Sequence, residues 1–124
     1  MRKLIESELE NLSTKDIFLF RIRCGVCGRE YANNPMPFSK AGIPAQTKEK
    51  QILYDALYEQ EFRSVLHGVI QKAEEHINYC PICKRLVCNQ CFLICEDLDM
   101  CKECAAQLKE TGVPVLSDTQ EDVV

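Results

Sequence analysis

The cysteines are the residues of this sequence whose type and spacing best support a specific chemistry. Eight of the nine form four C-x-x-C pairs. A C-x-x-C turn can place two sulfurs on one metal ion, and backbone N–H groups in the turn stabilise the thiolates. Eight thiolates are enough for two tetrahedral four-cysteine sites, so the pattern predicts two structural Zn²⁺ ions. The pairs are Cys24/Cys27, Cys80/Cys83, Cys88/Cys91 and Cys101/Cys104.

The composition favours a chain whose thiols stay reduced. Nine is an odd number, so a closed disulfide framework would leave one thiol over. The amino-terminal residues MRKLIESELENL carry three glutamates where a secretory signal would be apolar. No apolar run reaches the roughly 18 residues that span a bilayer. We therefore expect a cytoplasmic protein without a membrane span, in which the paired cysteines bind metal.

The four pairs can be divided into two sites in three ways. Consecutive pairing joins the first pair to the second, nested pairing joins the second to the third, and alternating pairing joins the first to the third. The five peptide steps from Cys83 to Cys88 reach roughly 16 Å when extended. That reach allows the chain to leave one site and enter another, whereas nested pairing would fold the β-prone KRLV segment tightly back. The linker therefore disfavours nested pairing only.

The run CPICKRLVCNQC, residues 80–91, resembles the middle of a FYVE finger and, more broadly, the cross-brace fingers that include RING and PHD domains. In the FYVE pattern the second and third pairs also lie four residues apart, and the two sites alternate along the chain. The last pair leads into a helix, as in treble-clef fingers. The resemblance implies site 1 with Cys24, Cys27, Cys88 and Cys91, and site 2 with Cys80, Cys83, Cys101 and Cys104.

Three departures limit what this resemblance implies. Fifty-two residues separate the first two pairs, where FYVE fingers have a much shorter connection. The residues EEHINY stand where FYVE domains carry a basic, histidine-rich motif that binds phosphoinositide. Cysteines fill all eight ligand places, whereas RING and PHD fingers usually include a histidine. We carry over the ligand roles alone, and expect neither phosphoinositide binding nor ubiquitin transfer.

The sequence before the first cysteine pair predicts a helix and a strand. Residues 1–16 would contain a short amino-terminal helix, over 2–12, and residues 17–23 are β-prone. The strand would continue through the C-x-x-C turn into a second strand that starts near Arg29. The apolar face of the helix would comprise Leu4, Ile5, Leu9 and Leu12.

The remaining chain predicts a small α+β fold with short β-hairpins and one long inserted helix. Residues 17–110 would form a single zinc-binding domain, in which 24–31 and 80–110 make the zinc finger and 47–78 the inserted helix. Three prolines between residues 33 and 44 indicate a loop. A short helix is expected over residues 100–110, and a loose acidic carboxy-terminal tail over residues 111–124.

The helix predicted over residues 47–78 has one clean apolar stripe in its second half. In its first half, Leu53 and Leu57 point nearly to the opposite side, because successive residues turn by about 100°. Either the helix breaks near Gln60, or this end is covered on two faces. The cover would be the amino-terminal helix, a protein partner or a second copy of the chain.

Three further residues could extend the metal chemistry. Cys95 is unpaired among apolar side chains, which predicts a small buried core thiol; the alternative is a ligand in a shifted register. His76 lies four residues before Cys80 and could replace a cysteine, although eight cysteines already satisfy two sites. His67 falls on the polar side of the long helix and is expected to face solvent.

Five cations beside the cysteines have two interpretations. They could form a phosphate-binding patch, or they could offset the formal charge of −2 that a Zn²⁺ ion with four thiolates carries. We favour the charge offset, because the aromatic residues of a base-stacking platform are missing here. The cations are Arg23, Arg29, Lys84, Arg85 and Lys102.

The sequence favours a non-catalytic zinc finger that serves as an adaptor between proteins. A catalytic zinc keeps an open position, whereas four-cysteine sites are closed, so we expect no enzyme activity. A nucleic-acid-binding zinc ribbon is one alternative, but the net charge of −4 disfavours it. The other alternative is a four-cysteine iron protein for electron transfer, or a thiol redox protein.

Overall fold

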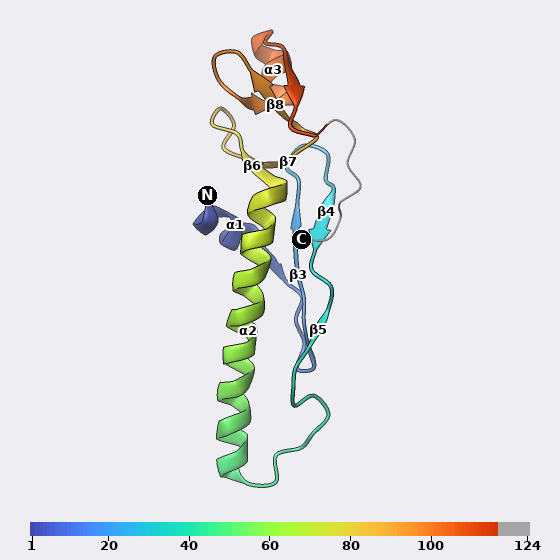
Figure 1. Cartoon of the computed structure of the whole chain (residues 1–124), viewed down its shortest axis with the longest axis vertical. Helices are drawn as coiled ribbons and strands as arrows, with labels where there is room; N and C mark the ends of the chain where they lie inside the picture. Colours follow the sequence, from blue (N-terminus) through green and yellow to red (C-terminus); the bar gives the residue numbers. More distant parts are fainter. Residues whose placement is uncertain (117–124) are drawn as a thin grey trace.

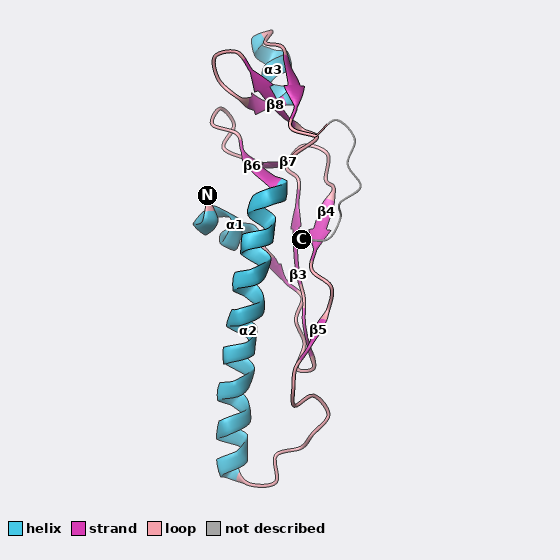
Figure 2. Ribbon diagram, in the orientation of Figure 1, coloured by secondary structure: helices cyan, strands magenta, loops and turns pink. Residues whose placement is uncertain are grey.

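The computed structural model describes residues 1–116 of the 124, and these residues form an elongated α+β structure around one long helix (Figure 1, Figure 2). The helices are α1 (Arg2–Glu8), α2 (Lys48–His76) and α3 (Lys102–Leu108). The strands are β1 (Glu10–Asn11), β2 (Ile17–Phe18), β3 (Phe20–Arg23), β4 (Glu30–Ala32), β5 (Met36–Pro37), β6 (Ile77–Tyr79), β7 (Leu86–Cys88), β8 (Phe92–Cys95), β9 (Met100–Cys101) and β10 (Gly112–Pro114). The α+β class and the long inserted helix are therefore confirmed.

Helix α2 is continuous and defines the long axis of the molecule (Figure 1). Its 29 residues span about 43 Å at the usual rise of an α-helix. The side chain of Thr47 caps the helix by accepting a hydrogen bond from the Lys50 N–H at 3.0 Å. At its other end, Ile77 takes an extended conformation and the chain continues directly into β6. The break considered near Gln60 does not occur.

Helix α1 is shorter than predicted and packs beside the carboxy-terminal half of α2. It ends at Glu8, because the next residues turn extended and β1 pairs with β3. Ile5 is fully buried in one cluster with Ile70 and Ala73 of α2. An ion pair of 2.8 Å between Arg2 and Glu74 holds the exposed side of the contact.

The ribbon of strands from β1 to β5 runs along α2. The predicted strand over residues 17–23 is present but interrupted at Leu19, where β2 ends before β3 begins. The buried side chain of Asn33 bridges this interruption: its Oδ1 accepts from Phe20 N–H at 2.7 Å and its Nδ2 donates to the Phe18 carbonyl at 3.2 Å. An amide side chain thus replaces strand pairing where the loop after β4 departs. The predicted loop over residues 33–44 contains the short strand β5.

A second apolar cluster, here called the aromatic cluster, joins this ribbon to α2. Phe18, Phe20, Phe38 and Val69 are buried in it, with Leu57, Tyr58, Phe62, Val65 and Leu66 partly buried around them. The Phe18 ring lies 5.0 Å from Tyr58, and Phe20 lies 5.2 Å from Phe62 in an edge-to-face arrangement. Leu57 therefore packs against aromatic rings. Of the covers considered for Leu53 and Leu57, helix α1 is not one, since α1 lies near the other end of α2 and Leu53 is 58% exposed.

The remaining strands and α3 gather beyond the carboxy-terminal end of α2 (Figure 2). Strands β6 and β7 form one hairpin, and β10, β8 and β9 form a three-stranded antiparallel sheet in that order. Residues 112–114 are therefore a strand, which corrects the prediction of a loose tail from residue 111. Ladder hydrogen bonds to β8 hold this segment in place. Val115 and Leu116 donate backbone hydrogen bonds to Phe92 and Asn89, and residues 117–124 of the predicted tail lie outside the described residues.

Candidate metal centres

The structure brings the eight paired cysteines together in two groups. Within each group, all four Sγ atoms lie within 4.8 Å of one another. The division alternates along the chain: the first pair meets the third and the second meets the fourth, as predicted for sites 1 and 2. Group 1 is Cys24, Cys27, Cys88 and Cys91, and group 2 is Cys80, Cys83, Cys101 and Cys104.

The spacing of the sulfurs fits a tetrahedral metal ion. Cys27 Sγ lies 3.8 Å from Cys88 Sγ, Cys83 Sγ lies 3.8 Å from Cys101 Sγ, and Cys80 Sγ lies 3.9 Å from Cys104 Sγ. A tetrahedron with zinc–sulfur bonds of about 2.3 Å has edges of about 3.8 Å. Six of the eight thiols are buried, while Cys83 is half-buried and Cys27 is exposed. Each group could therefore hold a metal ion.

The first two pairs sit in turns of the same design. Cys24/Cys27 connect β3 to β4, and Cys80/Cys83 connect β6 to β7. In both turns the residue after the second cysteine has a positive φ and donates its N–H to the carbonyl of the first cysteine. It is Gly28, with φ 76° and a bond of 3.1 Å, in one turn and Lys84, with φ 67° and 2.8 Å, in the other. Glycine suits this left-handed position, but the second turn adopts it with lysine.

The last two pairs use strand ends and a helix start. Cys88 ends β7, and Cys91 lies in the turn that leads into β8. Cys101 ends β9 and caps α3, where its sulfur accepts the Cys104 N–H at 3.4 Å. The predicted helix over residues 100–110 is therefore shorter, Lys102–Leu108, but it carries the last pair as expected.

In group 1, hydrogen bonds converge on one sulfur. Cys24 Sγ accepts from the N–H groups of Val26 at 3.3 Å, Cys27 at 3.5 Å and Cys88 at 3.2 Å. A hydrogen bond from the Cys88 thiol and these backbone N–H groups lower the pKa of Cys24 to about 4, although burial opposes the shift. The same contact with the Cys24 thiolate raises the pKa of Cys88. The group already favours at least one thiolate, the form that binds metal.

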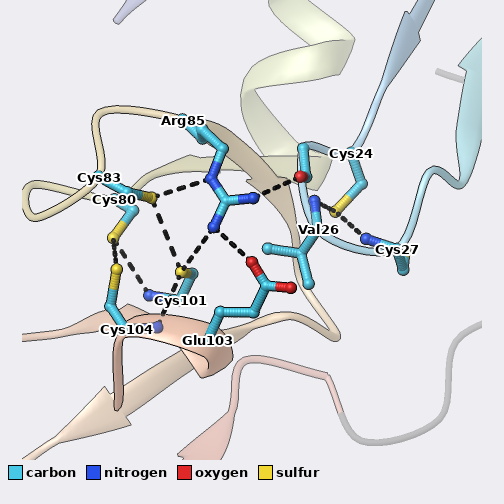
Figure 3. Close-up of polar contacts among 10 residues, drawn as sticks. Cys24, Val26, Cys27, Cys80, Cys83, Arg85, Cys101, Glu103 and Cys104 are labelled. Atoms are coloured by element: carbon cyan, nitrogen blue, oxygen red, sulfur yellow. Dashed lines mark hydrogen bonds and ion pairs between the residues drawn. The ribbon is translucent and has the colours of Figure 1, made fainter. Parts of the chain in front are cut away.

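In group 2, Arg85 supplies a side-chain donor. Its Nε donates to Cys83 Sγ at 3.1 Å, and the Cys101 N–H donates to Cys80 Sγ at 3.3 Å (Figure 3). Burial alone would raise the pKa of Cys83. Hydrogen bonds from Arg85 and from the thiols of Cys80 and Cys104 outweigh burial and lower this pKa to about 6. The sequence predicts only a general charge offset for Arg85, and no local pattern indicates that its side chain contacts sulfur.

Three of the other cations near the cysteines pair with acidic side chains or are exposed. Arg23 pairs with Glu30 at 3.0 Å and with Glu10 at 3.7 Å. Lys84 and Lys102 are exposed. Arg23 is therefore engaged by two carboxylates.

The remaining candidate ligands lie outside both groups. Cys95, at the end of β8, is half-buried, with its Sγ 3.8 Å from the Leu93 carbonyl. It is thus less buried than predicted. His76 stacks on the buried Tyr31 ring at 6.0 Å, and His67 faces solvent as expected. A ligand role for Cys95 or His76 finds no support among the described groups.

Comparisons of the chain with protein-family models, curated proteins and solved structures find no match in any of the three. Within residues 1–116, none of the helices is both long and apolar enough to cross a membrane.

Proposed function

We propose that this chain is a non-catalytic zinc-binding protein that acts as a protein–protein interaction module, with both ions in structural roles. The observation that carries the proposal is the closed donor set: each group offers four sulfurs, at tetrahedral spacing, to one ion. Four protein ligands leave no position for a water or a substrate. The free thiols also suit a reducing compartment, and we place the protein in the cytoplasm.

Zinc is the proposed metal, although four thiolates also suit iron. Metal analysis of the purified protein separates the two. We expect two zinc ions per chain and a colourless protein. Iron at either site, with the visible absorption of iron–thiolate bonds, would favour the electron-transfer alternative and overturn the structural assignment.

The proposed class is the cross-brace group of treble-clef fingers. The alternating division of the pairs and the position of the last pair at the start of α3 support it. The large departure is α2, inserted between the first two turns. Lipid binding and ubiquitin transfer form no part of the proposal, because their motifs are absent from this sequence.

The amino-terminal end of α2, which lies away from the cysteine groups, is the proposed partner surface. Ile52 is 69% exposed and Leu53 58% exposed on α2, and Ile43 on the preceding loop is 50% exposed. Ile43, together with Phe38 and Tyr54, also lines an open groove of about 740 Å³. Leu57 belongs to the aromatic cluster and is not available to a partner. Of the two leucines that the sequence suggests for a partner contact, only Leu53 remains, and the exposed Ile52 joins it. Exposed apolar residues gathered at one end suit a protein contact.

The partner surface is tested by affinity capture from the native host with matched variants. The double variant Ile52→Glu/Leu53→Glu should lose the proteins that the unchanged chain retains. The control, Gln60→Glu/Gln71→Glu, adds the same charge to exposed positions of α2 outside the groove and should retain them. Zinc content and circular dichroism should be the same for all three. Identical capture by the two double variants would remove this surface from the proposal.

Nucleic acid is not the proposed partner. The acidic net charge and the engagement of Arg23 and Arg85 with carboxylates and sulfurs support a charge-offset role for the cations. In a gel-shift assay near 50 mM salt, where electrostatic binding is strong, we expect no complex with DNA or RNA.

A further inference from the structure

Arg85 contacts sulfurs of group 2 and the backbone of the turn that carries Cys24 and Cys27 of group 1 (Figure 3). On the side of group 2, its Nε donates to Cys83 Sγ at 3.1 Å, and one terminal nitrogen lies 3.8 Å from Cys101 Sγ and 2.6 Å from a Glu103 oxygen. On the side of group 1, its other terminal nitrogen donates to the Gly25 carbonyl at 2.7 Å. Gly25 lies inside the turn that carries Cys24 and Cys27, so one guanidinium holds parts of both sites.

The backbone around Arg85 brings the two sites into close contact. The Gly25 N–H donates to the Leu86 carbonyl at 2.8 Å, and the Cys88 N–H donates to Cys24 Sγ. A Cβ placed on Gly25 would lie 3.1 Å from both Arg85 Cβ and the Leu86 carbonyl oxygen. The first turn therefore packs directly on residues 85–86, which would have to shift to admit a side chain at position 25.

We infer that Arg85 is a positioning residue shared by the two metal sites, and that it couples metal binding at one site to metal binding at the other. An ion in site 1 holds the Cys24–Cys27 turn, and with it the Gly25 carbonyl that orients the guanidinium. The oriented guanidinium then donates to Cys83 in site 2. Because coupling between binding sites is reciprocal, an ion in site 2 strengthens site 1 by the same factor.

The chemistry requires arginine at this position. The planar guanidinium presents donors in several fixed directions, so it can reach a sulfur, a carbonyl and a carboxylate together. A lysine ammonium carries the same charge on a single nitrogen and cannot span these acceptors. Arg85→Lys therefore separates positioning from charge: it keeps the positive charge and loses the connection between the sites.

The test is a double-mutant cycle of full-length proteins loaded with ¹¹³Cd²⁺ in place of the native ion. Cys27→Ser disables site 1 by removing its one exposed ligand, and Arg85→Met removes the connection. The unchanged chain, the two single variants and the double variant are titrated with a competing chelator. The cadmium signal that survives in Cys27→Ser belongs to site 2, and its loss gives the dissociation constant of site 2 in each protein.

With Arg85 present, Cys27→Ser should weaken site 2 by about tenfold, the lower range for losing a partner that orients metal ligands. With Arg85→Met or Arg85→Lys, the same loss of Cys27 should change site 2 by less than about twofold, as for independent sites. The inference is wrong if Cys27→Ser leaves site 2 unchanged in the presence of Arg85. It is also wrong if Cys27→Ser weakens site 2 equally with and without Arg85, since the backbone alone would then carry the coupling.

Two controls separate positioning from a general loss of stability. Arg23→Met removes an arginine next to Cys24 that pairs with Glu10 and Glu30, and it should leave the coupling intact. With Co²⁺ as the probe, Arg85→Met should move the sulfur-to-cobalt charge-transfer band of site 2 to lower energy, because Cys83 loses a hydrogen bond. An unmoved band would contradict the contact between Arg85 and the ligand sulfur. Cys91→Ser repeats the cycle if Cys27→Ser does not fold.

Discussion

The cysteine groups gather beyond the carboxy-terminal end of α2, whereas the aromatic cluster packs along its length, and the two regions are built from different side chains. Around the groups, the buried residues are mainly cysteines and aliphatic side chains, with Tyr31 as the large aromatic exception. The aromatic cluster instead interlocks the rings of Phe18, Phe20 and Phe38 with side chains of α2. Aromatic rings bury enough area to hold short strands by packing alone, whereas small thiols do not. We expect the first region to depend on metal and the second to be independent of it.

The comparison also explains why hydrogen bonds are distributed differently. Near the cysteines, backbone N–H groups and Arg85 are directed at sulfur. Near the aromatic cluster, the buried polar side chain is Asn33, which is directed at the backbone of the interrupted strand. The hydrogen bonds to sulfur stabilise thiolates, and those of Asn33 satisfy the backbone groups of Phe18 and Phe20 that strand pairing leaves without a partner.

Removing the metal should have the largest effect. A strong chelator should unfold residues 80–110, because metal binding supplies the folding free energy of small zinc modules, on the order of 10 kcal/mol. The amino-terminal two thirds of α2 should stay helical. Hydrogen exchange by mass spectrometry checks both statements, and added zinc should restore protection. Equal protection of β7, β9 and α3 with and without metal would show that the cysteine region does not depend on metal for its fold.

Truncating a buried ring should affect the aromatic cluster and spare the metal sites. Phe20→Ala removes a ring packed on Phe62 and should lower the free energy of unfolding by about 3–5 kcal/mol. Urea denaturation measures the loss, and metal analysis should still give two ions per chain. Ile43→Ala, at an exposed position, is the control with little expected change. Metal release in Phe20→Ala would show that the two regions are not separate.

Removing the Asn33 amide should have an intermediate effect. In Asn33→Ala the Phe20 N–H and the Phe18 carbonyl lose a buried partner, which costs about 1–3 kcal/mol. Thermal denaturation checks the size of the loss. Asn33→Asp keeps the acceptor for Phe20 and loses the donors, so its loss should differ from that of alanine. Wild-type stability in Asn33→Ala would mean that water satisfies both groups.

The smallest effect should come from Cys95, the unpaired cysteine. Cys95→Ser should change the free energy of unfolding by no more than about 0.5 kcal/mol and leave the metal content unchanged, because its half-buried sulfur lies outside both groups. The matched change Cys88→Ser, within group 1, should release one ion. A lost ion in Cys95→Ser would make Cys95 a ligand.

Much of this structure follows from local patterns. The spacing of the cysteine pairs predicts turns that hold two sulfurs. The apolar stripe in the second half of the helix predicted over residues 47–78 places α2, Lys48–His76, within two residues at each end. Local patterns do not predict most of the short strands, because the pairing of these strands depends on partners far along the chain. Strand β10 forms only because β8 offers it a free edge, and α1 ends early because β1 pairs with β3. Neither partner is visible within the segment concerned.

The sequence by itself determined the chemistry: eight thiols in four C-x-x-C pairs, which favour two four-cysteine metal sites. Residue type and short-range spacing suffice for that, because two ligands of each pair lie within one turn. Only the tertiary structure decided that Leu57 packs on aromatic rings while Leu53 stays exposed, and that Arg85 reaches both sites. Those outcomes depend on where segments sixty residues apart meet, since Gly25 and Arg85 share no local pattern.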